Sequence, residues 1–389
     1  MHPVRESLPA AAEAVAELAS GLVAQMEHER RLSPDVVKAL AGAGFMRHFV
    51  PTAFGGNAGT FRDLMRAVTV LGETCAATAW CASLFASSPR FVSFFPPEGR
   101  QEIWAGGPDA AVVCSVIPYG EAVGEPGGLR VSGRWPYMSG IECADWVIVC
   151  AKELLARGGP RLTLVAVPRA QCRAEDTWLS VGMQATGSNT VVVEDVFVPA
   201  HRVGDRAALF AGRPADPADP AEPRTAGLAP LPAVNGLTFV VPALGAARGA
   251  LALLTDHLGR KLHNVPVLPG VPGALDNQTT YETVLARSAA EIDATQLLLE
   301  RIADLADSGE PITPEQVARN ARDSAFAVDT LAGAVNRIFR TAGTSGQAAD
   351  GPLQRIWRDV NAIATHQALQ IEPTARAYAR SLFTPRSTP

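Results

Sequence analysis

Residues with reactive side chains are spread along this chain in ways that disfavour several kinds of chemistry. The histidines and cysteines do not group with each other or with acids at metal-ligand spacing, which predicts no metal site. The cluster Gly343-Thr344-Ser345-Gly346 lacks the spacing of a nucleophile elbow, so hydrolysis has little support. The sequence has no phosphate-binding glycine loop and no G-x-G-x-x-G after a strand, so no dinucleotide fold is indicated.

His366 is the side chain best suited to proton transfer. It follows Asp359 by seven residues, which puts both near one face if they share a helix. An imidazole exchanges protons near neutral pH, so His366 is a candidate catalytic residue. The alternative is a histidine that only packs within a helix bundle.

The elements that must position such residues separate into regions of different texture. Residues 1–109 read as an N-terminal helical domain. Ser33-Pro34-Asp35 and Thr60-x-x-Asp63 are both typical helix starts, with a hydroxyl cap and an acid in the first turn. Residues 206–234 form a Pro-rich connector, which we expect to be a loop or linker because proline blocks regular helix.

Residues 110–205 change to the period of strands and predict a small antiparallel β-domain. The expected strands are short, rich in valine and aromatic residues, and bounded by Gly, Pro and Asp. They cover residues 111–116, 129–132, 146–151, 162–167 and 190–198.

Residues 235–389 return to a helical pattern. Thr313-Pro314-Glu315-Gln316 is a capping box with proline at the first helical position. Leu285, Ile292, Leu299 and Ala306 recur every seven residues, which predicts long helices packed at a shallow angle in a bundle.

Composition limits the partners. The net charge is -5 and acids and bases are interspersed, so neither nucleic acid nor an anionic membrane is an expected partner. The apolar stretch 236–254 is interrupted by Pro242 and Arg248, which favours a buried helix over a membrane span. Glutamates occupy the first residues where a secretory segment is apolar, and no cysteine forms a C-x-x-C pair; both predict a cytoplasmic protein.

Four local patterns, in order along the chain, resemble the acyl-CoA dehydrogenase family. They are residues 182–199 ending in Glu194-Asp195-Val196-Phe197-Val198-Pro199, the helix end Leu258-Gly259-Arg260-Lys261-Leu262, the loop Gly343-Thr344-Ser345-Gly346, and Ile356-Trp357-Arg358-Asp359. The resemblance implies a mainly α fold with a central β-domain: N-terminal helices, a middle antiparallel β-barrel-like domain and a C-terminal four-helix bundle. Members of this family are usually tetramers.

One branch of that family is a closer match. Trp80, residues 135–140, Gly187-Ser188-Asn189, and Trp357-Arg358-Asp359 with His366 resemble the two-component flavin-dependent monooxygenases (group D). The nearest are the hydroxylases of aromatic polyketides, such as that of the actinorhodin pathway. Amino-sugar N-oxygenases are more distant relatives.

The chain lacks the base that a dehydrogenase of this family needs. Removal of an α-proton requires a carboxylate beside the flavin. In the family it follows the "Y-R-D" motif or precedes the "E-R-x-x-F" motif, but here Asn361–Gln367 and Asn235–Phe239 contain no Asp or Glu. Monooxygenation is therefore favoured over dehydrogenation.

The resemblance implies roles for individual residues. His366 would deprotonate a phenol or steady the flavin hydroperoxide, and Ser139 would lie near flavin N5. The further residues implied to bind flavin are Ser115, Trp135, Thr186, Gly187, Ser188, Arg260 and Gly343, with Arg260 reaching a phosphate, often across a subunit boundary. Those implied to line the substrate pocket are Trp80, Phe85 and Tyr119. For each, a packing, turn or surface role is the alternative.

The function so implied is hydroxylation of an aromatic, polyketide-derived secondary metabolite through a C4a-hydroperoxyflavin. Oxygen is the co-substrate. The flavin is reduced FMN, with FAD as the alternative, and it comes from a separate NAD(P)H:flavin reductase. An amino-sugar N-oxygenase is the rival enzyme, and a non-catalytic aromatic-metabolite-binding or assembly protein is the rival of another class.

Overall fold

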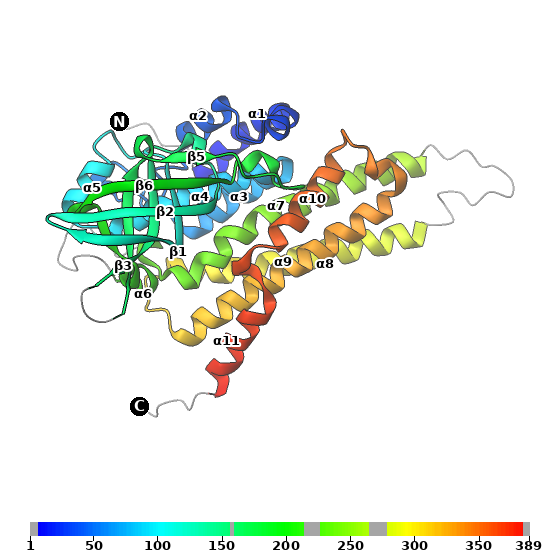
Figure 1. The fold of residues 1–389 in the computed structure, drawn as a ribbon. Coiled ribbons are helices and arrows are strands. Elements are labelled where there is room, and N and C mark those ends of the chain that lie inside the picture. Colours follow the sequence, from blue (N-terminus) through cyan, green and yellow to red (C-terminus); the bar gives the residue numbers. More distant parts are fainter. Residues whose placement is uncertain (1–6, 156–158, 214–225, 264–277, 384–389) are drawn as a thin grey trace, which may run out of the picture.

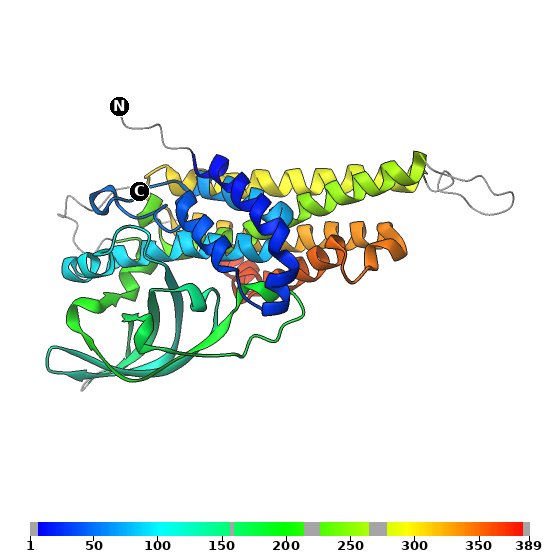
Figure 2. The ribbon, with the colours of Figure 1, turned by 90° about the horizontal axis from the view of Figure 1, so that it is seen from above.

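Three structural parts follow one another in the chain. The computed structural model describes residues 7–155, 159–213, 226–263 and 278–383. N-terminal helices and a β-sheet lie together at one end, and long C-terminal helices extend away from them (Figure 1). Seen from above, the sheet lies to one side of the long helices and the first helices lie across them (Figure 2). The mainly helical fold with a central sheet is as predicted.

The N-terminal helices begin where their caps predict. The Ser33 side chain accepts from Asp35 N at the start of α2, and the Thr60 side chain accepts from Asp63 N at the start of α3. A hydroxyl cap satisfies a backbone N–H that has no partner within the helix, and this fixes the first turn. The helices are α1 Leu8–Glu29, α2 Pro34–Ala43, α3 Phe61–Thr74, α4 Ala76–Ser87 and α5 Pro97–Ile103.

The middle domain is one seven-stranded sheet in the order β5-β6-β2-β1-β3-β4-β7. Its strands are β1 Val112–Glu125, β2 Gly128–Met138, β3 Trp146–Leu154, β4 Arg161–Pro168, β5 Arg173–Glu175, β6 Asn189–Pro199 and β7 Val203–Asp205. The prediction of a purely antiparallel domain is wrong at one pairing, because β1 and β3 are parallel. Side-chain alternation reports which face is buried but not strand direction, so the sequence pattern could not reveal this crossover.

The C-terminal part consists of long helices packed side by side. They are α7 Leu231–His263, α8 Gln278–Asp307, α9 Pro314–Ala342, α10 Pro352–Ala364 and α11 Ile371–Phe383. The predicted capping box of Thr313 and Gln316 is present at the start of α9. Ile292, Leu299 and Ala306 are buried along α8, as their seven-residue spacing predicts, whereas Leu285 in the same series is half-buried.

Helix α7 is long and apolar and is largely buried. Residues Leu231–Lys261 are long and apolar enough to cross a bilayer, but 72% of their most apolar window is buried inside the protein. That burial supports the prediction of a core helix. Residues Arg206–Ala211 of the Pro-rich connector form the short helix α6, and α7 begins at Leu231 with Pro232 in its first turn. Residues 214–225 of the connector lie outside the described residues.

Candidate functional site

Three hydroxyl side chains form a continuous chain of hydrogen bonds where the sheet meets the helices. The Thr186 hydroxyl donates to the Met183 carbonyl at 2.9 Å and lies 2.6 Å from Ser188 Oγ. Ser188 Oγ lies 2.8 Å from Ser139 Oγ, which accepts from Trp80 Nε1 at 3.0 Å. We call Thr186, Ser188 and Ser139 the hydroxyl chain. It brings together Trp80, Ser139, Thr186 and Ser188, all of which the sequence singled out.

Two turns with left-handed backbone hold the hydroxyl chain. Tyr137 and Met183 have φ of 64° and 55°, which is strained for residues with a side chain. Gly140, at φ 73°, donates its N–H to the Thr186 carbonyl at 2.9 Å and so ties the turns together. A Cβ on Gly140 would lie 2.6 Å from the ring of Phe85, which is fully buried beneath it.

Asp359 anchors the second turn from α10. Its Oδ1 accepts from Met183 N at 2.5 Å, and burial raises the pKa of this carboxyl to about 7. The neighbouring Arg358 donates to the Val181 carbonyl at 2.5 Å and pairs with Glu27 of α1. The Trp357-Arg358-Asp359 motif therefore fastens α10 to the loop that carries the hydroxyl chain.

His366 lies beside the hydroxyl chain but not in a helix. The expectation of a helical His366 is wrong, because α10 ends at Ala364 and His366 caps a short 3-10 turn. The Thr365 hydroxyl donates to the Ala362 carbonyl at 2.7 Å, a local bond that competes with continued helix. The His366 ring centroid lies 3.9 Å from that of Phe239 and 5.5 Å from that of Trp80.

The protonation state of His366 follows from its surroundings. Burial lowers the pKa of the imidazole to about 4, so it is neutral at pH 7. Nδ1 accepts from Ala368 N at 3.2 Å, which places the ring hydrogen on Nε2. His366 therefore presents an N–H donor, as a group that stabilises a negatively charged oxygen would.

The two positions where a dehydrogenase base is expected hold other groups. Asn361 donates to the Trp357 carbonyl at 2.7 Å, and Phe239 packs on His366. The nearby Asp359 is occupied by the Met183 N–H. Nothing in the sequence marks Phe239 as a site residue except its place in an apolar segment that contains no acid.

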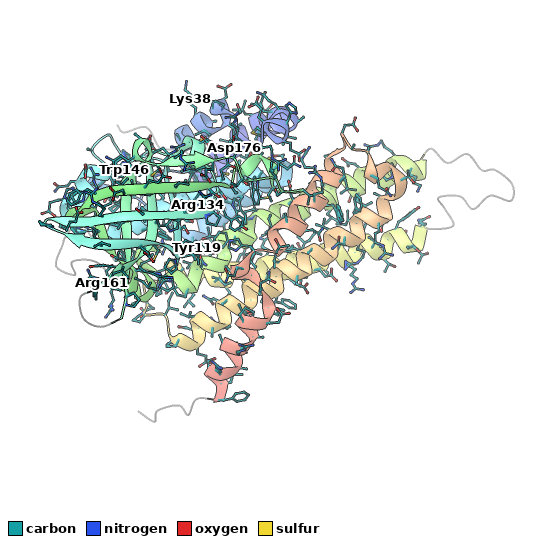
Figure 3. All side chains as sticks on the ribbon, viewed as in Figure 1. Lys38, Tyr119, Arg134, Trp146, Arg161 and Asp176 are labelled. Carbon is teal, nitrogen blue, oxygen red and sulfur yellow. The ribbon has the colours of Figure 1, made fainter. Side chains whose placement is uncertain are left out.

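The remaining candidates do not take part in the hydrogen bonds of the hydroxyl chain. Trp135 is fully buried, donates Nε1–H to the Cys150 carbonyl at 2.9 Å and covers Gly120. Ser115 is half-buried on β1, and Tyr119, on the same strand, is 52% exposed (Figure 3). Gly187, at φ 53°, forms the turn between Thr186 and Ser188.

Arg260 and Gly343 lie at the opposite end of the bundle. Arg260 is exposed on the last turns of α7, and Gly343 follows the last residue of α9. Both helix ends are remote from the sheet in both views (Figures 1 and 2). Neither residue can join the hydroxyl chain of its own subunit.

Comparison with known proteins identifies the family. The family pattern "Acyl-CoA dehydrogenase, N-terminal domain" matches residues 5–90, and "Acyl-CoA dehydrogenase, C-terminal domain" matches residues 237–371. The chain thus belongs to the acyl-CoA dehydrogenase-like flavoproteins. Within them it belongs to the oxygenase components of two-component flavin-dependent monooxygenases, as its relatives establish.

Those relatives match nearly the whole chain. The oxygenase component of the FADH(2)-dependent resorcinol hydroxylase of Rhizobium sp. is 31% identical, over 95% of this chain and 92% of its own. The oxygenase subunit HsaA of Rhodococcus jostii is 30% identical, over 91% of each. The structure of XiaF from Streptomyces sp., in complex with FADH2 and glycerol, superposes with a TM-score of 0.87 at 29% identity, covering 99% of this chain and 97% of that one.

Proposed function

We propose that this protein hydroxylates an aromatic compound with oxygen and a reduced flavin that a separate reductase supplies. The observation that carries the proposal is the pairing of the hydroxyl chain with a neutral, aromatic-lined His366, at a site where the expected dehydrogenase positions hold no carboxylate. Dehydrogenation needs a base there, whereas oxygen transfer needs polar anchors for the ring, an apolar wall and one donor.

The residues present fit a flavin. Ser139 and Ser188 each retain a lone pair for a polar atom of the ring, and Trp80 and Phe239 offer flat apolar surface. Bound reduced flavin supplies the electrons that activate oxygen. Ser139, Gly187 and Ser188 would hold the ring, Thr186 would support them from behind through the hydroxyl chain, and Ser115 is a further candidate on β1.

His366 provides the polar group of the reaction. Its Nε2–H would donate a hydrogen bond to an oxygen atom, of the substrate or of the oxygen that reacts with it, as that atom gains negative charge. Burial of the site strengthens this hydrogen bond. Trp80, Phe85 and Tyr119 are proposed to line the aromatic pocket. Of these, Trp80 contacts His366, Phe85 lies beneath Gly140 and Tyr119 is at the surface.

We also propose the class of substrate, the cellular location, the flavin and the assembly. The substrate is a polyketide-derived phenol, in keeping with the sequence resemblance, and the reductase and oxygenase work in the cytoplasm. The relatives include a resorcinol hydroxylase named as FADH(2)-dependent and a structure with bound FADH2, so reduced FAD is tested beside the reduced FMN that the sequence predicted. Arg260 is proposed to bind the flavin phosphate of a neighbouring subunit in a homotetramer, with Gly343 at the same end of the bundle.

The test is anaerobic titration of the protein with reduced FMN and reduced FAD, followed by oxygen and a panel of phenols. Mass spectrometry should find a product heavier by one oxygen atom, formed only when a reductase or chemically reduced flavin is present. Turnover with NADH and oxidised flavin alone would contradict the dependence on a separate reductase. Absence of reduced-flavin binding would favour a protein that only binds the aromatic metabolite.

A further inference from the structure

The hydroxyl chain has a direction that its two ends determine. A carbonyl can only accept a hydrogen bond and an indole N–H can only donate one, whereas a hydroxyl has a single hydrogen. The Met183 carbonyl lies at one end and takes the only hydrogen of Thr186. At the other end, Trp80 Nε1–H donates into Ser139.

Every hydroxyl hydrogen is thereby assigned. Because the only hydroxyl hydrogen of Thr186 is used in the bond to Met183, Ser188 must be the donor in the 2.6 Å hydrogen bond between Ser188 and Thr186. The 2.8 Å contact between Ser188 and Ser139 must then be donated by Ser139. The donation from Trp80 agrees with this order. Ser139 and Ser188 are left with lone pairs and with no hydrogen to offer.

The accessible end of the chain is therefore an acceptor. Exposure rises from 1% at Thr186 to 5% at Ser188 and 8% at Ser139, so Thr186 is the most buried residue of the hydroxyl chain and Ser139 the least buried, which is why we assign the ligand to the Ser139 end. A ring atom that carries hydrogen matches Ser139 as it stands. A flavin ring atom that can only accept a hydrogen bond would face a lone pair of Ser139, which is unfavourable unless one hydrogen bond of the hydroxyl chain breaks.

We propose that Thr186 is a positioning residue that sets the direction of the hydroxyl chain and so makes the site select reduced over oxidised flavin. N5 of reduced flavin carries a hydrogen, and N5 of oxidised flavin is a bare acceptor. This inference rests on the proposed function. A two-component oxygenase must discriminate between reduced and oxidised flavin, because both are present in solution. Thr186 would contribute to this discrimination without touching the flavin ring.

The experiment compares dissociation constants in wild type and variants by anaerobic titration with reduced flavin and aerobic titration with oxidised flavin. Thr186→Val removes the terminal donor while keeping the side-chain shape, so Ser188 and Ser139 can reverse and offer a hydrogen. The ratio of the oxidised to the reduced dissociation constant should fall about tenfold, equivalent to ~1.4 kcal/mol. Ser188→Ala frees the Ser139 hydrogen by a second route and should lower the ratio similarly.

Two further variants separate direction from packing. Thr186→Ser keeps the donor and should restore the wild-type ratio. Thr295→Val removes a hydroxyl that is also 1% exposed and also donates to a backbone carbonyl, in α8, and should leave the ratio unchanged. An unchanged ratio in a folded Thr186→Val protein, or an equal fall in Thr186→Ser, would overturn the inference.

The placement of the flavin is checked separately with Ser139→Ala. This variant should weaken reduced-flavin binding. If it leaves both dissociation constants unchanged, Ser139 does not face the ring and the inference fails, while a wild type that binds reduced flavin and hydroxylates a phenol keeps the proposed function. If wild type binds no reduced flavin, both fail.

Discussion

At the scale of single residues, His366 distinguishes between the two chemical roles that the sequence left open. A base that deprotonates a phenol through Nε2 needs a free lone pair there. The bond from Ala368 N to Nδ1 puts a hydrogen on Nε2 instead, and exchanging the tautomer would give up that bond. We therefore infer that His366 donates a hydrogen bond in the reaction.

The donor role predicts a graded response to substitution. His366→Ala should lower the hydroxylation rate about a hundredfold and raise hydrogen peroxide release, as for loss of one donor to a developing oxyanion. His366→Gln keeps an N–H donor and should recover part of the rate. Product and peroxide yields per reduced flavin oxidised measure both effects. Equal loss in the two variants would point to a base.

Asp359 predicts an unusual pH dependence of stability. Burial raises the pKa of this carboxyl from the usual 3.8 to about 7 in the folded state. Between pH 3.8 and pH 7 the carboxyl is therefore protonated in the folded protein and ionised in the unfolded protein. Stability from this group is fully present below pH 3.8 and is lost as the pH rises through 7.

Asp359→Asn should remove that loss, because an amide oxygen still accepts from Met183 N and does not ionise. The free energy of unfolding of the variant relative to wild type should rise by roughly 1 to 4 kcal/mol from pH 4.5 to pH 8. Urea unfolding at several pH values measures this. The exposed Asp350→Asn is the control, and parallel pH profiles for Asp359→Asn and wild type would refute the assignment.

At the scale of elements, the turn containing Gly140 shows how backbone geometry holds the site. Gly140→Ala would strain a left-handed residue and push a Cβ into the Phe85 ring at 2.6 Å. We expect a loss of ~1–3 kcal/mol in the free energy of unfolding and weaker flavin binding. Gly124→Ala on β1, where the added Cβ meets nothing within 4 Å, is the matched control. Equal stability of the two variants would show that the turn tolerates the shift.

Sequence alone predicted the features that depend on local chemistry. The caps at Ser33, Thr60 and Thr313 satisfy backbone groups a few residues away, so their signal is contained in short motifs. The buried seam of α8 likewise follows from its seven-residue period.

Features that depend on distant partners, or on a local bond that is compatible with more than one backbone path, could not be predicted in this way. The parallel pairing of β1 with β3 depends on how the chain crosses the sheet. The exit of His366 from α10 depends on a threonine bond that helix interiors also tolerate. The hydrogen bond from Met183 to Asp359 joins residues 176 positions apart. It also depends on a left-handed backbone at Met183, where the sequence has no glycine to indicate such a conformation.

At the scale of the whole molecule, the long helices expose apolar side chains that a single subunit leaves uncovered. They are Leu297 on α8, Phe326 on α9, and Leu382 and Phe383 on α11. Buried interfaces between copies would cover such groups. They support the proposed homotetramer, in which the bundle end that carries Arg260 can approach the site of a neighbouring subunit.

Arg260 therefore predicts a link between assembly and flavin binding. Its guanidinium suits a phosphate because two N–H groups can donate side by side, yet the end of α7 lies far from the sheet of its own subunit (Figures 1 and 2). Arg260→Ala should weaken reduced-flavin binding by about 2 kcal/mol or more, and Arg260→Lys should recover only part of this. Lys38→Ala, an exposed charge on α2 (Figure 3), is the control for net charge.

The decisive measurement follows flavin affinity and molecular mass together, by anaerobic titration and light scattering over a range of protein concentrations. In wild type, dilution that dissociates the oligomer should weaken flavin binding, because each site loses the arginine of its neighbour. In Arg260→Ala the affinity is already low, so the same dissociation should change it little. An affinity that falls equally with dilution in both proteins would mean that assembly shapes the site without Arg260. If the assembled Arg260→Ala protein bound reduced flavin as tightly as wild type, Arg260 would be a surface residue with no role in flavin binding.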